Sequence, residues 1–418
     1  MALQGPFVVV AERPAPEVIE ALRTAGAFPI IETGWADAPA AFASVEPEGL
    51  VLAELCADGA CFKALADQFK ARDGAYIPVI ARVRDDAAPL FPGALTIAAS
   101  APAERLVNRL ASALRVRTLH STVLRRIRTI AAHGERPPEL PAGDPLDEAS
   151  ALLAGRGPSY PALSVAIGQH VGLVGALSVE SAARALHVRS IDGVVIGDGF
   201  GPRIVEALLT VLADDVRFRD LPVVVLGGHP SFERFCEQLP NLERIAEPPG
   251  RLVERFLPFV RLHAFVERMR RMLTSLDAKG MIDPDTGLLA QDAFWRDFNR
   301  AVEDAEKRGV GLSVARFSFG ASDRRSGLDA ARLLSRLMRQ VDFACREADN
   351  SIFAVFTETD LRAAHVVARR LASILKNTTM AADRKRMGVD AAVTLATLRP
   401  TDSVDSLIAR VVGKAASA

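Results

Sequence analysis

The sequence predicts a multidomain α/β protein in which two doubly wound parallel sheets are followed by a smaller α+β domain. Three observations lead to this prediction. The chain has 418 residues, a length typical of two or three domains. Short apolar runs alternate with helical patterns over residues 6–115 and again over 163–246, which is typical of parallel sheets with both faces covered. After about residue 277, longer amphipathic helices separate the apolar strands.

The composition limits the classes of function that the chain can have. Hydrophobic residues make up 49% of it, and 51 basic residues balance 51 acidic ones, so no overall field attracts nucleic acid. Neither the four cysteines nor the seven histidines show metal-ligand spacing. The N-terminus has no basic segment, and no apolar run reaches membrane-spanning length. We therefore expect a soluble, cytoplasmic protein without a metal, a cofactor, a nucleic-acid site or a membrane-inserted segment.

The first doubly wound domain is expected to contain five strands. Each is a short apolar run, and segments with helical periodicity separate the runs. The runs are residues 7–10, 28–31, 49–52, 77–80 and 95–97. Five such units within about 110 residues predict a flavodoxin-like fold.

The same pattern returns after a linker, as a repeat of domain size. A long helix at residues 103–132 leaves the first domain, and a proline-rich stretch follows at 133–145. The strands of the second copy are predicted at residues 163–167, 192–196, 221–226 and, more weakly, 242–246. A second long helix at 250–276 leads into the third domain.

The third domain has the α+β pattern of nucleotide cyclases. A polar turn at 283–288 precedes an amphipathic helix, and Arg339 and Asp342 are expected on one face of a later helix, three residues apart. The elements predicted after the amphipathic helix are a strand at 312–317, a helix at 327–341, two strands around a polar turn at 349–351, a helix at 361–375, a strand at 391–398 and a helix at 403–414.

These patterns set the predicted domain limits. Residues 1–118 form the first doubly wound domain, 119–158 a helix and proline-rich linker, 159–262 the second doubly wound domain, 263–276 a linker helix, and 277–418 the α+β domain.

Both doubly wound domains resemble receiver domains of response regulators, in topology and in pieces such as residues 77–80 and 221–224. The resemblance implies an acidic pair for magnesium, an aspartate that takes the phosphoryl group, and a lysine before a proline. These positions fall on Ala11, Glu12, Ala53 and Ala101 in the first copy and on Gly168, Gln169, Gly197 and Glu247 in the second. Phosphotransfer is therefore expected to be lost. Asp198, one residue after the expected aspartate position at Gly197, is the remaining candidate for phosphorylation.

The third domain resembles GGDEF domains, the diguanylate cyclase family. Residues 283–288 are similar to the Asp-x-Leu-Thr-Gly-Leu opening of that family, with Asp285 in place of the leucine, and residues 393–396 are similar to its late core strand. The place of the Gly-Gly-Asp/Glu-Glu-Phe turn is taken by Ala348, Asp349, Asn350, Ser351 and Ile352. The resemblance covers residues 277–418, and with the two receiver-like domains it identifies a receiver–receiver–GGDEF type of effector.

The departures from that family imply a degenerate domain that is not an enzyme. Forming c-di-GMP from GTP needs two carboxylates that hold magnesium and glycines that let the backbone approach the nucleotide. The strand aspartate of the family falls on Arg316, and the signature acids fall on Asn350 and Ser351. The helix with the guanine-contacting residues appears shortened, with residues 321–327 as a polar loop. No catalytic residue is expected.

The resemblance also implies a retained allosteric site for c-di-GMP. The family's Arg-x-x-Asp motif, five residues before the signature turn, falls on Arg339 and Asp342, and a further arginine falls on Arg370, beside Arg369. An arginine can bind a phosphate or the Hoogsteen edge of guanine with two hydrogen bonds, and a carboxylate can accept from the guanine N1–H and amino group. We therefore expect Arg339, Asp342, Arg370 and Arg369 to bind c-di-GMP.

Three readings remain open at this point. The first is a non-catalytic c-di-GMP receptor and scaffold in bacterial signalling, a homodimer that docks protein partners through its receiver-like domains. The second is a ligand-independent dimeric scaffold, in which Arg339 and Asp342 form an ordinary solvated ion pair. The third is a residual diguanylate cyclase or a regulator driven by phosphorylation.

Overall fold

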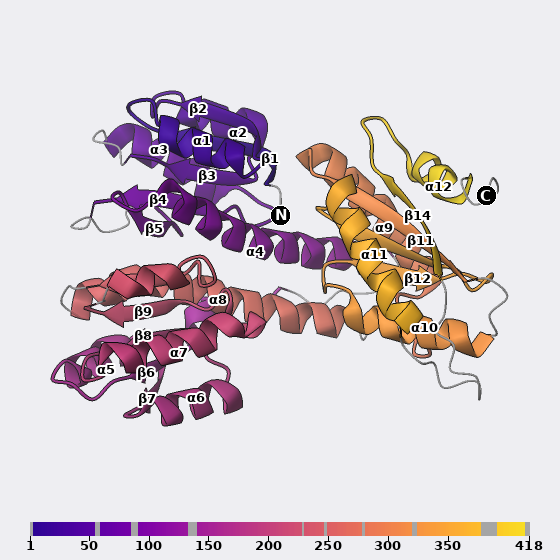
Figure 1. The fold of residues 1–418 in the computed structure, drawn as a ribbon. Helices are drawn as coiled ribbons and strands as arrows, with labels where there is room; N and C mark the ends of the chain where they lie inside the picture. Colours follow the sequence, from indigo (N-terminus) through magenta and orange to yellow (C-terminus); the bar gives the residue numbers. More distant parts are fainter. Residues whose placement is uncertain are drawn as a thin grey trace.

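The computed structural model describes residues 3–54, 59–84, 91–132, 140–227, 230–245, 249–277, 281–319, 324–377 and 391–413. These residues form three sheets. Two parallel-sheet units lie side by side at one end of the molecule, and an antiparallel unit lies at the other (Figure 1). Two long helices, α4 (Ala103–Ala131) and α8 (Pro249–Asp277), run between the ends. No helix in the described ranges is long and apolar enough to cross a membrane.

The first unit confirms the five predicted strands as one parallel sheet in the order β2-β1-β3-β4-β5. Apart from the partly exposed edge strand at residues 28–33, its apolar strands are buried between helices on both faces, as expected for a sheet of this type. Its elements are β1 (Gln4–Val10), α1 (Pro16–Thr24), β2 (Phe28–Thr33), α2 (Ala38–Val45), β3 (Gly49–Leu52), α3 (Gly59–Ala71), β4 (Val79–Val83) and β5 (Leu95–Ala98).

The second unit repeats this topology, in the order β10-β9-β8-β6-β7 with all neighbours parallel. Its elements are β6 (Ser150–Ala154), α5 (Tyr160–Gly168), β7 (Gly172–Ala176), α6 (Val179–Val188), β8 (Gly193–Ile196), α7 (Pro202–Asp214), β9 (Val223–Leu226) and β10 (Leu242–Ile245), with the short 3-10 helices η1 (Pro145–Glu148), η2 (Val216–Phe218) and η3 (Pro230–Phe235).

One predicted strand of the second unit is wrong. Residues 163–167 belong to α5, because Leu163 and Ile167, four residues apart, bury one face of a helix. The first strand is instead β6, inside the stretch predicted as a linker, so Gly168 and Gln169 end a helix and do not follow the first strand. The edge strand β7 was not predicted, since its two glycines and partial exposure leave no apolar run.

The C-terminal unit is an antiparallel sheet in the order β12-β13-β11-β14. Its elements are α9 (Gln291–Arg308), β11 (Leu312–Phe319), α10 (Arg324–Leu337), β12 (Phe343–Arg346), β13 (Ile352–Thr357), α11 (Leu361–Asn377), β14 (Ala391–Thr397) and α12 (Val404–Gly413). The helix α10 begins three residues before the predicted start at 327 and ends at Leu337. Arg339 and Asp342 therefore lie in the turn after it, which corrects their expected place on a helical face. Residues 321–323 of the predicted polar loop lie outside the described residues.

The helix α4 (Ala103–Ala131) contacts all three units and packs along α8 (Pro249–Asp277). Its buried Arg109 donates to the carbonyl of Thr96 in the first unit and pairs with Glu243 of the second at 2.6 Å. Near its other end, Arg125 and Arg126 both reach the fully buried Asp297 of α9, at 3.2 and 3.1 Å. Buried arginine–carboxylate pairs thus fix α4 between the units.

A buried carboxylate joins the first unit to the C-terminal unit. Glu48 accepts from Arg117 of α4 at 2.6 Å and from Arg308 of α9 at 2.6 Å, and Arg308 also pairs with Glu358 at 2.6 Å. Burial acts to raise the pKa of Glu48, but the two guanidinium groups hold it below its ordinary value. The ionised form of Glu48 is therefore the one that stabilises this contact.

We expect Glu48→Gln to destabilise the protein by about 3 kcal/mol at neutral pH, because it leaves the buried Arg117 with a neutral partner, while Arg308 keeps its pair with Glu358. A carboxyl group whose pKa is lowered on folding contributes stability above its unfolded value of 4.5, and that stability is lost as the pH falls through its folded value. The difference in thermal unfolding between variant and wild type should therefore shrink as the pH is lowered progressively below 4.5. The exposed Glu17→Gln is the control, and a difference that does not change with pH would contradict the assignment.

Candidate functional site

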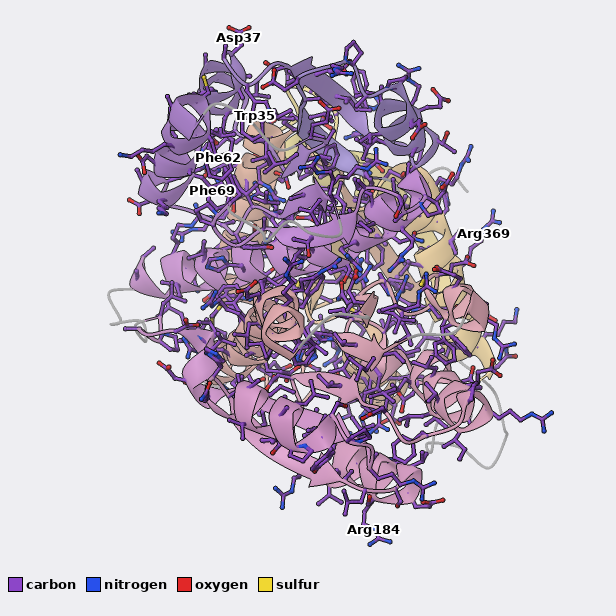
Figure 2. The ribbon with its side chains drawn as sticks, turned by 90° about the vertical axis from the view of Figure 1, so that its left-hand side faces the viewer. Trp35, Asp37, Phe62, Phe69, Arg184 and Arg369 are labelled. Carbon is purple, nitrogen blue, oxygen red and sulfur yellow. The ribbon has the colours of Figure 1, made fainter. Side chains whose placement is uncertain are left out.

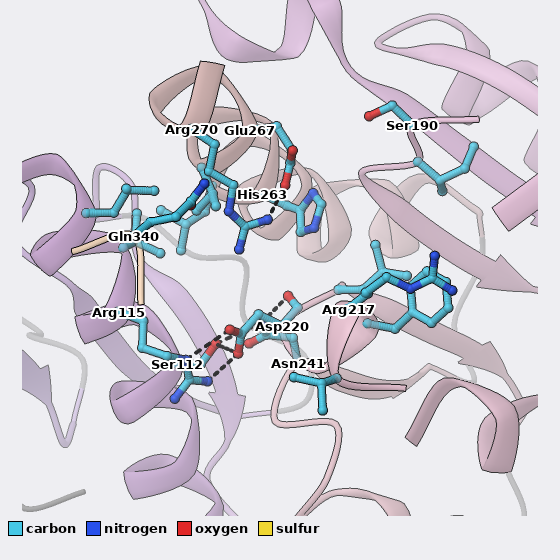
Figure 3. Close-up of a pocket in the computed structure, with 18 of the residues that line it drawn as sticks. Ser112, Arg115, Ser190, Arg217, Asp220, Asn241, His263, Glu267, Arg270 and Gln340 are labelled. Carbon is cyan, nitrogen blue, oxygen red and sulfur yellow. Dashed lines mark hydrogen bonds and ion pairs between the residues drawn. The ribbon is translucent and has the colours of Figure 1, made fainter. Parts of the chain in front are cut away.

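A cavity of about 750 Å³ lies where α4, α8, the second unit and the C-terminal unit meet (Figure 3). The C-terminal unit contributes the segment that carries the Arg-x-x-Asp motif, and Glu358. Polar residues on the other walls are Ser112, Arg115 and Thr118 of α4, His263, Glu267 and Arg270 of α8, and His187, Arg189, Ser190, Arg217, Asp220 and Asn241 of the second unit. Four separate parts of the chain therefore build one cavity.

Arg339 lies at the wall of this cavity, in the turn between α10 and β12. The turn is closed by a hydrogen bond from the Asp342 amide to the Arg339 carbonyl, at 3.0 Å. The Arg339 guanidinium donates to both carboxylate oxygens of Asp342, at 2.8 and 2.9 Å, and its Nη2 also reaches the Thr357 carbonyl and the Thr359 hydroxyl. Among the described residues Nη1 has no acceptor, so this nitrogen is free to bind a ligand.

Asp342 orients Arg339 and is closed to solvent in this structure. Its side chain is 2% exposed, and its Oδ1 also accepts from the Thr357 amide at 3.0 Å. Burial raises the pKa of Asp342, and the neighbouring guanidinium opposes that shift. The pair is thus not intrahelical, and its carboxylate is buried while the Arg339 side chain is 45% exposed. Because it is buried, Asp342 does not present its oxygens to a guanine edge in this arrangement.

The cavity carries more positive than negative side chains. Five arginines line it, Arg115, Arg189, Arg217, Arg270 and Arg339, against the three carboxylates of Asp220, Glu267 and Glu358, a net charge of two positive among the lining residues described. Arg115 donates its Nε to Asp220 at 2.9 Å, and Arg270 pairs with Glu267 one turn away on α8 (Figure 3). The wall residues outside the C-terminal unit were missed from the sequence, since no local motif joins segments so far apart.

The other two predicted ligand residues lie elsewhere on the C-terminal unit. Arg369 and Arg370 are neighbours on α11, and both are exposed. Arg369 points outward from the edge of the molecule (Figure 2). Neither residue belongs to the described lining of the cavity, so the cavity does not bring them to Arg339.

The turn at Ala348–Ile352 is tied down by an arginine. Arg316 donates to the Asp349 carboxylate at 2.6 Å and to the Ser351 hydroxyl at 3.3 Å, and Asn350 adopts a positive φ of 66°. Although burial acts to raise it, hydrogen bonds from Ser351 and the Arg316 guanidinium hold the pKa of Asp349 below its ordinary value. A guanidinium therefore occupies the space beside this turn. Within the described ranges, no group of His, Cys, Asp and Glu side chains is arranged to hold a metal ion.

The polar turn at 283–288 has a structural part in the C-terminal unit. Asp283 accepts from the Thr286 hydroxyl at 2.7 Å and from the Asp285 amide at 3.1 Å, and Gly287 adopts a positive φ of 71°. Arg332 of α10 donates to the Asp285 carbonyl at 2.7 Å. These bonds hold the turn against α10.

Asp198, the remaining phosphorylation candidate, is engaged by the loop after β6. Its carboxylate accepts from the hydroxyl and amide of Ser159, and its carbonyl accepts from the amides of Arg156 and Gly157. A Cβ atom at Gly157 would lie 2.3 Å from the Asp198 Cγ, so glycine is required for this close approach. Asp198 stabilises the β6–α5 loop in this arrangement.

No protein-family model matches this sequence, and no curated protein matches it. Among solved structures, the coiled-coil and GGDEF segment of DgcB from Caulobacter crescentus, in complex with c-di-GMP, is 17% identical and covers 35% of this chain and 85% of its own, with a TM-score of 0.30. The GGDEF domain of FimX from Pseudomonas aeruginosa is 17% identical over 33% of this chain and 93% of its own, also at 0.30. The diguanylate cyclase SiaD from the same organism, in complex with its activator SiaC, is 17% identical over 50% of this chain and 92% of its own, at 0.31. At these TM-scores the likeness carries no argument about ligand or activity.

We expect Asp342→Asn to lower the thermal stability of the ligand-free protein by several degrees, because it weakens a buried charge-assisted pair worth about 2 kcal/mol. The measurement is the melting temperature without ligand, with the exposed Asp405→Asn as a control that should behave like the wild type. An unchanged melting temperature would mean that Asp342 does not hold Arg339 in solution.

Proposed function

We propose that this chain is a non-catalytic receptor for c-di-GMP, which binds through a retained Arg-x-x-Asp site of a degenerate GGDEF domain. The observation that carries the proposal is Arg339, which lines a large cavity and whose guanidinium is oriented by a buried carboxylate, with no acceptor for Nη1 among the described residues. An arginine fixed in this way loses little conformational entropy when it binds a phosphate or a guanine edge.

The size and charge of the cavity support this ligand. Its volume of about 750 Å³ lies within the range of roughly 300–1,000 Å³ typical of small-molecule sites. A cyclic dinucleotide carries two phosphodiester charges, which complement the net positive lining. Arg115, Arg270 and Arg339 offer donor groups from three elements, suited to phosphate oxygens and to the O6 and N7 atoms of guanine. Arg370 and Arg369 enter the proposal through the family resemblance alone.

The absence of catalysis is part of the same proposal. Magnesium-assisted cyclisation requires carboxylates around the metal, and Arg316 instead places a cation against Asp349 and Ser351. A bound divalent cation would meet that guanidinium at close range. The substitution removes a ligand and adds a repulsive charge, so it acts against metal binding in two ways.

Ligand binding would act on partner docking through the relative placement of the units. The cavity touches α4, α8, the second unit and the C-terminal unit, so a bound dinucleotide would contact all of them. Within the chain, the face formed by β5 and α4 already packs against the face formed by β10 and α8. Arg109 and Glu243 join these two faces. Docking of proteins, and the expected homodimer, would therefore use other surfaces of the receiver-like units.

A ligand-independent scaffold is the second candidate function. One observation favours it, since the Arg339–Asp342 pair is satisfied by the chain itself. The two candidates differ in one simple property, because a ligand that binds only the native state must raise its melting temperature.

Calorimetric titration of the full chain with c-di-GMP should give saturable binding with a dissociation constant on the order of micromolar or lower, about −8 kcal/mol. We expect Arg339→Ala to weaken binding at least tenfold, roughly 1.4 kcal/mol or more. Arg336→Ala, an exposed arginine of α10 outside the cavity lining, is the matched control. If the wild type does not bind, the scaffold reading stands. Arg370→Ala is expected to weaken binding less than Arg339→Ala.

Incubation of the protein with GTP and magnesium should yield no c-di-GMP, measured by mass spectrometry against an active cyclase. Arg316 is the reason, since it occupies the position where the metal would sit. Formation of c-di-GMP above background would revive the enzymatic reading and refute the proposed role of the turn.

A further inference from the structure

The walls of the cavity contributed by α8 and the second unit hold hydrogen-bond acceptors that lack donors. Glu267 is 27% exposed, and Arg270 pairs with its Oε1 only; within the described part of the chain its Oε2 has no hydrogen-bond partner. The Oδ1 of Asn241 is buried and has no partner either, in a residue that is 6% exposed. A buried acceptor without a donor costs about 1–3 kcal/mol, so the Asn241 Oδ1 points to a missing donor. The Glu267 Oε2 is partly exposed and is open to a donor from the cavity.

Asn241 and Asp220 lie together in the wall. The Asn241 amide nitrogen donates to the Asp220 carbonyl at 2.8 Å and to the Ser112 hydroxyl at 3.3 Å, which fixes the orientation of the amide. The Ser112 hydroxyl in turn donates to the Asp220 carboxylate at 2.8 Å. Burial acts to raise the pKa of Asp220, but Arg115 and Ser112 hold it below its ordinary value. The Asp220 carboxylate is therefore ionised at neutral pH and 38% exposed.

The position of Asp342 makes these acceptors significant. Guanine presents two adjacent donors, N1–H and the 2-amino group, so a side chain that recognises this edge must accept hydrogen bonds from them. Asp342 is only 2% exposed, whereas the Asp220 side chain is 38% exposed although Arg115 and Ser112 also donate to it. Glu267 and Asp220 are the cavity carboxylates outside the C-terminal unit, and each stands beside an arginine that offers donors to the Hoogsteen edge or a phosphate.

We propose that the bases of the ligand are read by Glu267 of α8 and Asp220 of the second unit, which accept from guanine N1–H and N2–H, while Arg339 binds the phosphate or O6 side. This inference rests on the proposed function, since it assigns base recognition within the same cavity. Adenine replaces the N1–H donor with an acceptor lone pair, which would face a carboxylate. The two carboxylates therefore select guanine over adenine dinucleotides.

The test is titration of the full chain with c-di-GMP and, separately, with c-di-AMP. Glu267→Gln replaces one acceptor oxygen with a donor and should weaken c-di-GMP binding about tenfold, with no loss in affinity for c-di-AMP. Glu254→Gln, an exposed residue on the same helix and outside the cavity lining, should bind both as the wild type does. Asp220→Asn is the second variant, and its near-UV circular dichroism checks that the wall remains folded.

The outcomes separate this inference from the function on which it rests. If Arg339→Ala abolishes binding while Glu267→Gln and Asp220→Asn bind c-di-GMP like the wild type, the receptor stands and the base readers are wrong. Equal wild-type affinity for c-di-GMP and c-di-AMP would also overturn the inference. If the wild type binds neither dinucleotide, the proposed function fails first, and the assignment of base readers falls with it.

Discussion

The placement of the three units depends on buried arginines that leave α4 for carboxylates in other parts of the chain. Arg109 reaches the second unit, Arg117 reaches Glu48 of the first, and Arg125 and Arg126 reach α9. A buried guanidinium is tolerated only with a partner, so each of these pairs fixes one distance between units. The cavity is a product of that placement, because its walls belong to elements that touch only when α4 is held on all sides.

The sequence predicted the elements whose local signal is strong. The five strands of the first sheet and both long helices were identified because apolar runs and helical periodicity are local properties. It failed at β6, whose Ser-Ala-Leu-Leu-Ala has no β-branched residue, and at α5, whose apolar residues were mistaken for a strand. In both segments, tertiary contacts decided the secondary structure against the local apolar pattern.

The candidate site shows the same division at the level of single residues. The Arg-x-x-Asp motif located Arg339, but the roles within it follow from contacts: Asp342 is turned inward to hold the arginine, and the open acceptors belong to other units. Asp220 lies more than a hundred residues before Arg339 in the sequence, and Glu267 lies on α8. Neither is part of a recognisable motif. A motif can therefore name the anchor of a site without naming the groups that surround it.

The pairing of α4 also bears on the order in which the protein is made. Glu48 precedes α4 in the chain, but the other carboxylate partners of α4 leave the ribosome after it. These partners are Glu243 for Arg109, Asp220 for Arg115, and Asp297 for Arg125 and Arg126. During synthesis α4 therefore carries unpaired arginines until the second unit and then α9 emerge. The wall bearing Arg339 is completed last, so a nascent chain cannot close the cavity before residue 358 has been translated.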